Sequence, residues 1–234
     1  MQILVLPTAE AAAKRAALLI AEAAIIAIRK RGNFAFAVSG GTTPWLMLAE
    51  LAKQPIDWQR VHLFQVDERV APPGSPERNW THINEVLLSR VPIPPEHAHA
   101  MPVQLQDLGA AAADYEATLT RVAGTPPKLD LVHLGLGLDG HTASLVPGDK
   151  ALAIRNAEVA RTDVYKGHPR LTLTFQALNR ARSVLWLATG GEKRDVLAKL
   201  LHGDRTIPAG RIRGANATVL TENAAIDISG DSEA

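Results

Sequence analysis

The chain has 234 residues, 47% of them hydrophobic and 21% charged, which suits one buried core of the size of a single α/β domain. A net charge of +1 and an aromatic content of 4% argue against a surface dedicated to nucleic acid, but leave room for a local basic pocket. There is no cysteine, which excludes disulfides, thiolate nucleophiles and cysteine-based zinc sites.

The N-terminal segment lacks the basic region of a secretory signal. The longest apolar run, residues 16–28, is interrupted by Glu22 and is too short to span a bilayer. We therefore expect a single domain over residues 1–234 in the cytoplasm, with no membrane contact and no obligate protein partner. The polar residues 229–234 are expected to fray.

Short apolar runs alternate with longer helical patterns, which predicts parallel βα units. Strands are predicted at residues 3–6, 34–38, 61–66, 129–134, 157–161, 183–188 and 218–220, and their apolar interiors predict cover on both faces. Helices are predicted at residues 9–30, 44–53, 80–90, 108–122 and 192–202. Thr8 is predicted to cap the first helix, and Thr43 the second, with Pro44 as its first helical residue.

A glycine-rich segment joins the second strand to the second helix and consists of Ser39, Gly40, Gly41, Thr42, Thr43 and Pro44. Glycines let a ligand approach the backbone, and free N–H groups at a helix start favour an anion such as phosphate. A plain βα turn has the same composition, so both interpretations stay open. The segment lacks the lysine of a P-loop, which argues against nucleoside triphosphates.

Three consecutive charged residues, Asp67, Glu68 and Arg69, follow the third predicted strand. Ligands of parallel sheets bind outside the carboxyl ends of the strands, and Arg69 could hold a phosphate through its planar guanidinium. The alternative is a solvated loop with a local ion pair. Asn79, further along, either joins the same site or caps the next helix.

Residues 135–147 read GLGLDGHTASLVP directly after the fourth predicted strand. The opening matches G-x-G-x-x-G, with Glu158 near the place of a ribose-binding acid, but Pro147 leaves no room for the helix that a dinucleotide site requires. The remaining interpretation is a turn that presents Asp139 and His141. A neutral imidazole can take a proton from water, and Asp139 could orient it or bind substrate hydroxyls.

Two further cations follow strands: Arg170 and, at the start of the last predicted helix, Lys193. Each alone could be a solvated surface charge, but together they favour a pocket for a polyanion. The sequence has no G-x-S-x-G nucleophile elbow and no H-E-x-x-H, and His97 with His99 is too isolated to indicate a metal. Neither a metal nor another cofactor is predicted, and water activated by a histidine is the remaining chemistry.

These motifs resemble the 6-phosphogluconolactonase family along nearly the whole chain. The matching pieces, in order, are VSGGTTP at 38–44, DER at 67–69, residues 135–147, RLTL at 170–173 and GGEK at 190–193. The resemblance implies a three-layer α/β/α fold with a mostly parallel, Rossmann-like sheet, related to glucosamine-6-phosphate isomerase and ribose-5-phosphate isomerase. It also implies lactone hydrolysis in the oxidative pentose phosphate pathway, with His141 as general base and Arg69 and Lys193 near the phosphate.

The chain departs from the family at Leu138, where proline is common; leucine loosens the turn without removing a functional group. The sister family of glucosamine-6-phosphate deaminases shares the Gly-His core but continues Ile-Ala-Phe-Asn-Glu-Pro, whereas this chain continues TASLVP. The absent glutamate favours the lactonase. A sugar-phosphate isomerase or deaminase, and a non-catalytic sugar-phosphate sensor, are the alternative hypotheses.

Overall fold

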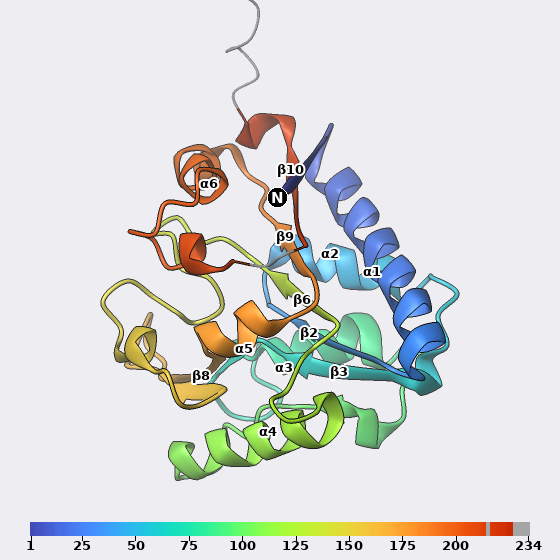
Figure 1. The fold of residues 1–234 in the computed structure, drawn as a ribbon, viewed down its shortest axis with the longest axis vertical. Helices are drawn as coiled ribbons and strands as arrows, with labels where there is room; N and C mark the ends of the chain where they lie inside the picture. Colours follow the sequence, from blue (N-terminus) through green and yellow to red (C-terminus); the bar gives the residue numbers. More distant parts are fainter. Residues whose placement is uncertain (214–215, 227–234) are drawn as a thin grey trace, which may run out of the picture.

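The computed structural model describes residues 1–213 and 216–226, which form two sheets (Figure 1). In the described chain a seven-stranded parallel sheet has the order β1-β10-β9-β6-β2-β3-β5, and a three-stranded antiparallel sheet has the order β4-β8-β7. The strands are β1 (Gln2–Leu6), β2 (Phe34–Val38), β3 (Val61–Gln65), β4 (Asp67–Arg69), β5 (Ala98–His99), β6 (Leu131–Leu134), β7 (Val159–Arg161), β8 (Arg170–Leu173), β9 (Val184–Leu187) and β10 (Ala217–Glu222). Residues 229–234, predicted to fray, lie outside the described residues.

Helices cover both faces of the parallel sheet (Figure 1). One core contains side chains of α1 (Ala9–Arg31), α2 (Thr42–Leu51) and α3 (Asn79–Ile83). The other core contains side chains of α4 (Leu108–Ala123), α5 (Phe175–Arg180) and α6 (Arg194–Leu201). The predicted three-layer α/β/α fold with a mostly parallel sheet is therefore confirmed.

The helix starts test two of the predictions. The Oγ1 of Thr8 accepts a hydrogen bond from the N–H of Ala11 at 3.2 Å, which confirms the cap of α1. Helix α2 begins at Thr42 and has Gly41 as its N-cap residue, so the prediction of Thr43 as the cap is wrong. The Oγ1 of Thr43 instead shares a hydrogen bond of 2.7 Å with Thr189 Oγ1, and the helix begins two residues earlier than predicted.

Other differences concern edges and short elements. The edge strand β1 leaves Ile3 and Val5 42% and 39% exposed, so the prediction that every strand is covered on both faces is wrong there. Strands β4, β5 and β8 and helix α5 were not predicted, because two to six residues give too short a pattern to show periodicity. The predicted helix at residues 80–90 is the short α3 continued by a π-helical turn, Asn84–Leu88.

The strand order reverses between β2 and β6. From β2 the chain builds the sheet outward through β3 to β5, and from β6 it builds outward in the other direction through β9 to β10, beside which the N-terminal strand β1 forms the edge. In open α/β sheets, ligands bind in the crevice at the carboxyl ends of the strands where such a reversal occurs. The topology therefore places the segments after β2 and β6 on the two sides of that crevice.

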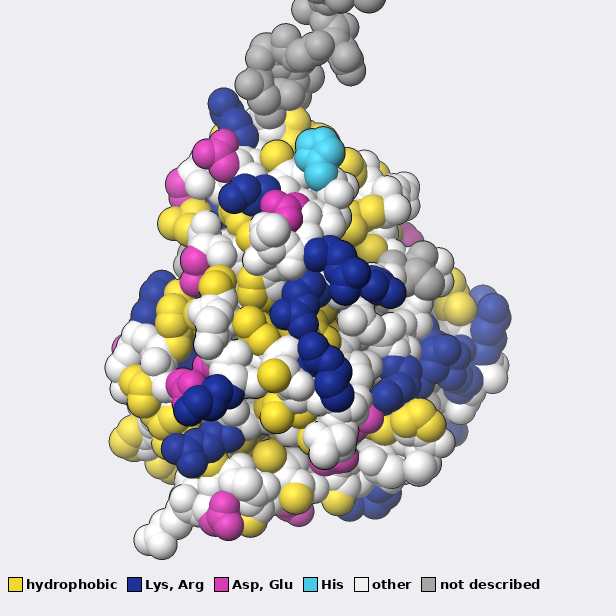
Figure 2. All heavy atoms as spheres, turned by 60° about the vertical axis from the view of Figure 1, so that its left-hand side comes forward, with side chains coloured by type: hydrophobic (Ala, Val, Ile, Leu, Met, Phe, Trp, Pro, Cys, Tyr) yellow, Lys and Arg dark blue, Asp and Glu magenta, His cyan; other side chains and the backbone are white. Residues whose placement is uncertain are grey.

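Although the net charge is near zero, the charged side chains are distributed unevenly over the surface. Figure 2 shows Lys and Arg side chains gathered in a band across the middle of one face, with Asp and Glu side chains scattered around it. No helix in the described part of the chain is long and apolar enough to cross a membrane.

Candidate active site

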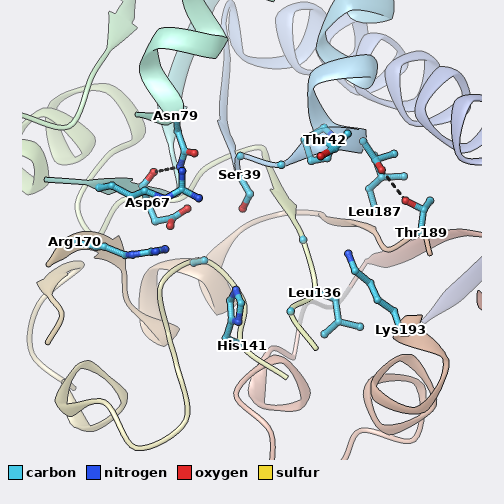
Figure 3. A pocket seen from close by; sticks show the side chains of 18 of the residues that line it. Ser39, Thr42, Asp67, Asn79, Leu136, His141, Arg170, Leu187, Thr189 and Lys193 are labelled. Atoms are coloured by element: carbon cyan, nitrogen blue, oxygen red, sulfur yellow. Dashed lines mark hydrogen bonds between the residues drawn. The ribbon is translucent and has the colours of Figure 1, made fainter. Parts of the chain in front are cut away.

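A cavity of about 310 Å³ lies at the carboxyl ends of the central strands (Figure 3). Eleven of the thirteen predicted site residues line it: Ser39, Gly40, Gly41, Thr42, Thr43, Asp67, Arg69, Asn79, His141, Arg170 and Lys193. They come from the segments that follow β2, β3, β6 and β9 and from the antiparallel sheet. The parallel strands end at one edge of the sheet, so residues far apart in sequence meet there.

Glu68 does not line the cavity and is fully buried. Its carboxylate accepts hydrogen bonds from the N–H groups of Asn79 and Trp80, both at 2.8 Å, and so caps α3. The Nε of Arg78, also buried, lies 3.5 Å from Glu68 Oε2. The structure therefore gives Glu68 an internal structural position, and the prediction that it contacts substrate is corrected.

Asp67 and Arg69 reach the cavity because β4 is a strand, and alternate residues of a strand face the same side. Strand β4 pairs with β8 so that Arg69 stands opposite Arg170 and Asp67 opposite Thr172. The pairing brings two guanidinium groups to one wall of the cavity. Burial lowers the pKa of Arg170, and its Nε has no hydrogen-bond partner among the described residues.

The buried carboxylate of Asp67 has one side-chain partner of its own: its Oδ2 accepts a hydrogen bond of 2.5 Å from Ser144 Oγ. The Nη1 of Arg170 lies 3.4 Å from the same hydroxyl. Asn79 does not cap α3; its Nδ2 donates to the backbone oxygen of Asp67 at 3.0 Å. Asn79 and Ser144 therefore fix the strand segment that carries Asp67.

His141 stands at the cavity with its Nδ1 turned away from it toward Asp139, 2.5 Å from Oδ1. A carboxylate only accepts hydrogen bonds, so in the neutral imidazole Nδ1 carries the proton and Nε2 has the lone pair. Burial raises the pKa of Asp139, but the hydrogen bonds and charge of His141 outweigh it and leave the pKa lowered. Asp139 itself does not line the cavity, which supports the predicted orienting role over contact with substrate.

Gly137 makes this arrangement possible. A Cβ at position 137 would lie 2.1 Å from Cε1 and Nδ1 of His141, inside the imidazole ring's own space. The turn is closed by hydrogen bonds from Gly140 N–H to Gly137 O and from Gly137 N–H to His141 O, both 2.9 Å. The glycine therefore lets the ring lie flat against its own turn.

On the other side of the cavity, the Ser39–Thr43 segment begins α2 and faces Lys193 and Thr189 (Figure 3). The buried Oγ of Ser39 has no hydrogen-bond partner within the described chain. A Cβ at Gly40 would lie 2.1 Å from Asn79 Oδ1, so glycine is needed where the loop meets α3. An N–H-rich helix start and an unused hydroxyl are suited to an anion.

Lys193 belongs to a short helical turn, Gly191–Lys193, after β9. Burial lowers its pKa, and Glu192 opposes that shift. Figure 3 shows its ammonium group and the guanidinium of Arg170 reaching in from opposite sides, with His141 between them. An anionic ligand would restore the stability of the charged ammonium.

Several lining residues had no functional prediction, among them Thr189, Glu192, Leu136 and Leu187. Thr189 and Glu192 follow β9, and their position at a strand end was the available signal. Within residues 1–213 and 216–226, no group of three or more His, Asp or Glu side chains is arranged to hold a metal ion.

Comparison with known proteins shows the family of the chain. Residues 7–221 match the family of glucosamine-6-phosphate isomerases and 6-phosphogluconolactonases. The chain belongs to this family. Among its curated members, a 6-phosphogluconolactonase of Nostoc sp. is 38% identical over 202 residues, covering 84% of this chain and 83% of the relative. A 6-phosphogluconolactonase of Mycobacterium leprae is 37% identical over 235 residues, covering 94% of both.

Solved structures of the family have the same fold. The crystal structure of 6-phosphogluconolactonase from Thermotoga maritima superposes with a TM-score of 0.84 at 32% identity, covering 94% of this chain and 98% of that one. A monomeric glucosamine-6-phosphate deaminase also gives 0.84, at 19% identity and with 96% and 98% coverage. The second likeness shows the fold alone, so the fold does not separate the two activities within the family.

Proposed function

We propose that this protein hydrolyses 6-phospho-D-glucono-1,5-lactone to 6-phospho-D-gluconate, using a water molecule activated by His141. The observation that carries the proposal is the Asp139–His141 pair, which leaves Nε2 free at a cavity whose walls hold three cations. The names of these two relatives support the same substrate. Proton removal from water by a positioned imidazole is an established form of general base catalysis.

The catalytic sequence begins at Nε2 of His141, which takes a proton from water as the oxygen attacks the C1 carbonyl carbon. The Nδ1–H donated to Asp139 stabilises the imidazolium that forms. The tetrahedral oxyanion forms in a cavity lined by the cations Arg69 and Arg170. When the bond from C1 to the ring oxygen breaks, that oxygen takes a proton and becomes a hydroxyl group, which balances the proton that His141 accepted and leaves the imidazole neutral again. The acid product then loses a proton to solvent and becomes the carboxylate.

In this proposal the phosphate lies against the start of α2, a position supported by Ser39, the N–H groups of the following residues and Lys193, which line the same part of the cavity. On this wall the hydroxyl of Ser39 has no hydrogen-bond partner in the described chain, and Lys193 supplies the one ammonium group among the described residues that line the cavity. Asp67, on the opposite wall, is suited to accept hydrogen bonds from the sugar hydroxyls.

A coupled assay tests the proposal. Freshly generated 6-phosphogluconolactone is supplied to the wild type and to His141→Ala, the spontaneous ring opening is subtracted, and 6-phosphogluconate is measured. General base catalysis typically contributes ~10²–10⁴-fold, so kcat of the variant should fall by about that factor. His202→Ala is the matched control, because this exposed imidazole contacts only a backbone oxygen of its own helix within the described chain.

Any one of three results would overturn the proposal. An unchanged rate in folded His141→Ala would show that His141 is not the general base. Ammonia released from glucosamine 6-phosphate would indicate a deaminase. Binding of 6-phosphogluconate with no turnover above background would indicate a sensor.

A further inference from the structure

Tyr165 lies at the tip of the hairpin that joins β7 to β8. Its N–H donates to His168 O at 3.0 Å, and His168 N–H donates back at 3.3 Å. The two residues between them, Lys166 and Gly167, have φ values of 49° and 84°. Positive φ at both positions is typical of the tight turns that match the twist of a hairpin.

The hairpin is held against the strand that carries the cavity's charged residues. The N–H of Val70, which follows β4, donates to Pro169 O at 3.0 Å. The backbone oxygen of Val70 accepts a hydrogen bond of 3.0 Å from Nδ1 of His168. The position of Tyr165 is therefore set by the antiparallel sheet, independently of the turn that carries His141.

The tyrosine hydroxyl reaches across to that turn. It donates to Asp139 Oδ2 at 3.2 Å, while Asp139 Oδ1 is occupied by His141. The rings of Tyr165 and His141 stand edge to face, with centroids 5.6 Å apart. The guanidinium of Arg170 lies 5.2 Å from the centre of the tyrosine ring, which joins the hairpin tip to the cationic wall.

We propose that Tyr165 is a positioning residue for the reaction: by holding the second oxygen of Asp139, it fixes the carboxylate that orients His141. The inference rests on the proposed function. Tyr165 does not line the cavity, so it acts through Asp139 and not on the substrate. It is partly exposed, and in the described chain its hydroxyl bonds only to Asp139, so the hydroxyl group can be removed without opening the core.

Tyr165→Phe isolates this contact, because it keeps the ring beside His141 and Arg170 and removes only the hydroxyl. The bond is long at 3.2 Å and lies at the surface, so we give it the value of an ordinary hydrogen bond, about 2- to 10-fold, and kcat should fall by about that factor with KM unchanged. Loss of the donor leaves the full charge of Asp139 acting on the imidazolium, so the acid limb of the pH–rate profile should move to higher pH.

The other charged groups of the cavity constrain how that shift is interpreted. Asp67 and Arg69 on β4, Arg170 on β8, and Glu192 and Lys193 after β9 line the same space as His141. Tyr165→Phe alters none of them, so a shift specific to this variant is assigned to Asp139. Val164→Ala is the matched control, since the side chain of Val164, next to Tyr165 in the sequence, is 69% exposed.

NMR titration of the His141 ring supplies a readout that needs no turnover, with His141→Gln used to assign the signal. The expected result is a higher imidazole pKa in Tyr165→Phe than in the wild type and in Val164→Ala. An unchanged pKa together with an unchanged kcat would overturn the inference, and so would a change confined to KM, which would make Tyr165 a substrate contact. If the wild type has no lactonase activity, the proposed function fails, and the titration still decides the role of Tyr165.

Discussion

Replacement of Glu68 by alanine should destabilise the fold and should not act mainly on substrate binding. The fully buried carboxylate accepts four hydrogen bonds of 2.8 Å. The donors are Gln65 Nε2 and the backbone N–H groups of Arg69, Asn79 and Trp80. The buried guanidinium of Arg78 is paired with the same group. Glu68→Ala therefore leaves a buried cation unpaired and the start of α3 uncapped.

The size of the effect follows from the buried charge. Removal of one partner of a buried ion pair costs about 3–5 kcal/mol, a large share of a total stability of ~5–15 kcal/mol. The unmade backbone hydrogen bonds do not simply add to this, because α3 can shift toward water. For a chain of this size each kcal/mol corresponds to about 2–4 °C, so the melting temperature should fall by roughly 6–20 °C.

Thermal unfolding followed by circular dichroism measures this change, with the exposed Glu77→Ala as control on the same loop. A melting temperature equal to that of the wild type, together with lost turnover, would refute the structural role. Glu68 would then contact the substrate, as its place in the sequence suggested.

Three further outcomes are expected. Lys193→Met should lower kcat/KM for the phosphorylated lactone by about 10- to 150-fold, which is the value of a hydrogen bond to a charged group, and should leave kcat/KM for unphosphorylated gluconolactone unchanged. Equal losses on both substrates would show that Lys193 does not bind the phosphate. Leu138 is the second residue of the turn closed by Gly140 N–H and Gly137 O, where proline is favoured, so Leu138→Pro should raise the melting temperature by about 1–4 °C at unchanged kcat. Burial, and then neighbouring imidazoles, lower the pKa of His62 and His99 to about 4 in the folded protein. Between about pH 6.5 and pH 4 the unfolded chain therefore binds more protons than the folded protein, and the free energy of unfolding should decrease as the pH falls through this range. The double variant His62→Gln/His99→Gln should flatten this dependence in melting curves recorded against pH.

The sequence allowed much of the site to be predicted because parallel strands make strand ends recognisable. Ser39, His141 and Lys193 each follow a strong apolar run, and the sheet brings those run ends together. No distance information was needed for that step, only the alternation of strands and helices.

What could not be predicted depends on the antiparallel sheet. Asp67, Glu68 and Arg69 were treated as one charged group because three residues without apolar alternation do not indicate a strand. As strand β4, they alternate: the outer two face the cavity and the middle one faces α3. The pairing of Arg69 with Arg170 and the reach of Tyr165 depend on this same sheet, so one unrecognised element accounts for all three omissions.

The segment after His141 is where this chain departs from the deaminase motif within a shared fold. Thr142 Oγ1 donates to Gly135 O, and Ser144 Oγ donates to Asp67, so these hydroxyl groups hold the turn and the opposite wall together. Val146 stands where the deaminase motif has glutamate, and it is a buried apolar side chain outside the cavity lining. An isomerase or deaminase moves protons on and off carbon and nitrogen, and the glutamate of the deaminase motif would supply a titrating group for this work. Asp67 and Glu192 also line the described cavity, but position 146 holds an apolar side chain outside its lining. The absence of a carboxylate at this position, and not the shape of the cavity, therefore favours the hydrolase.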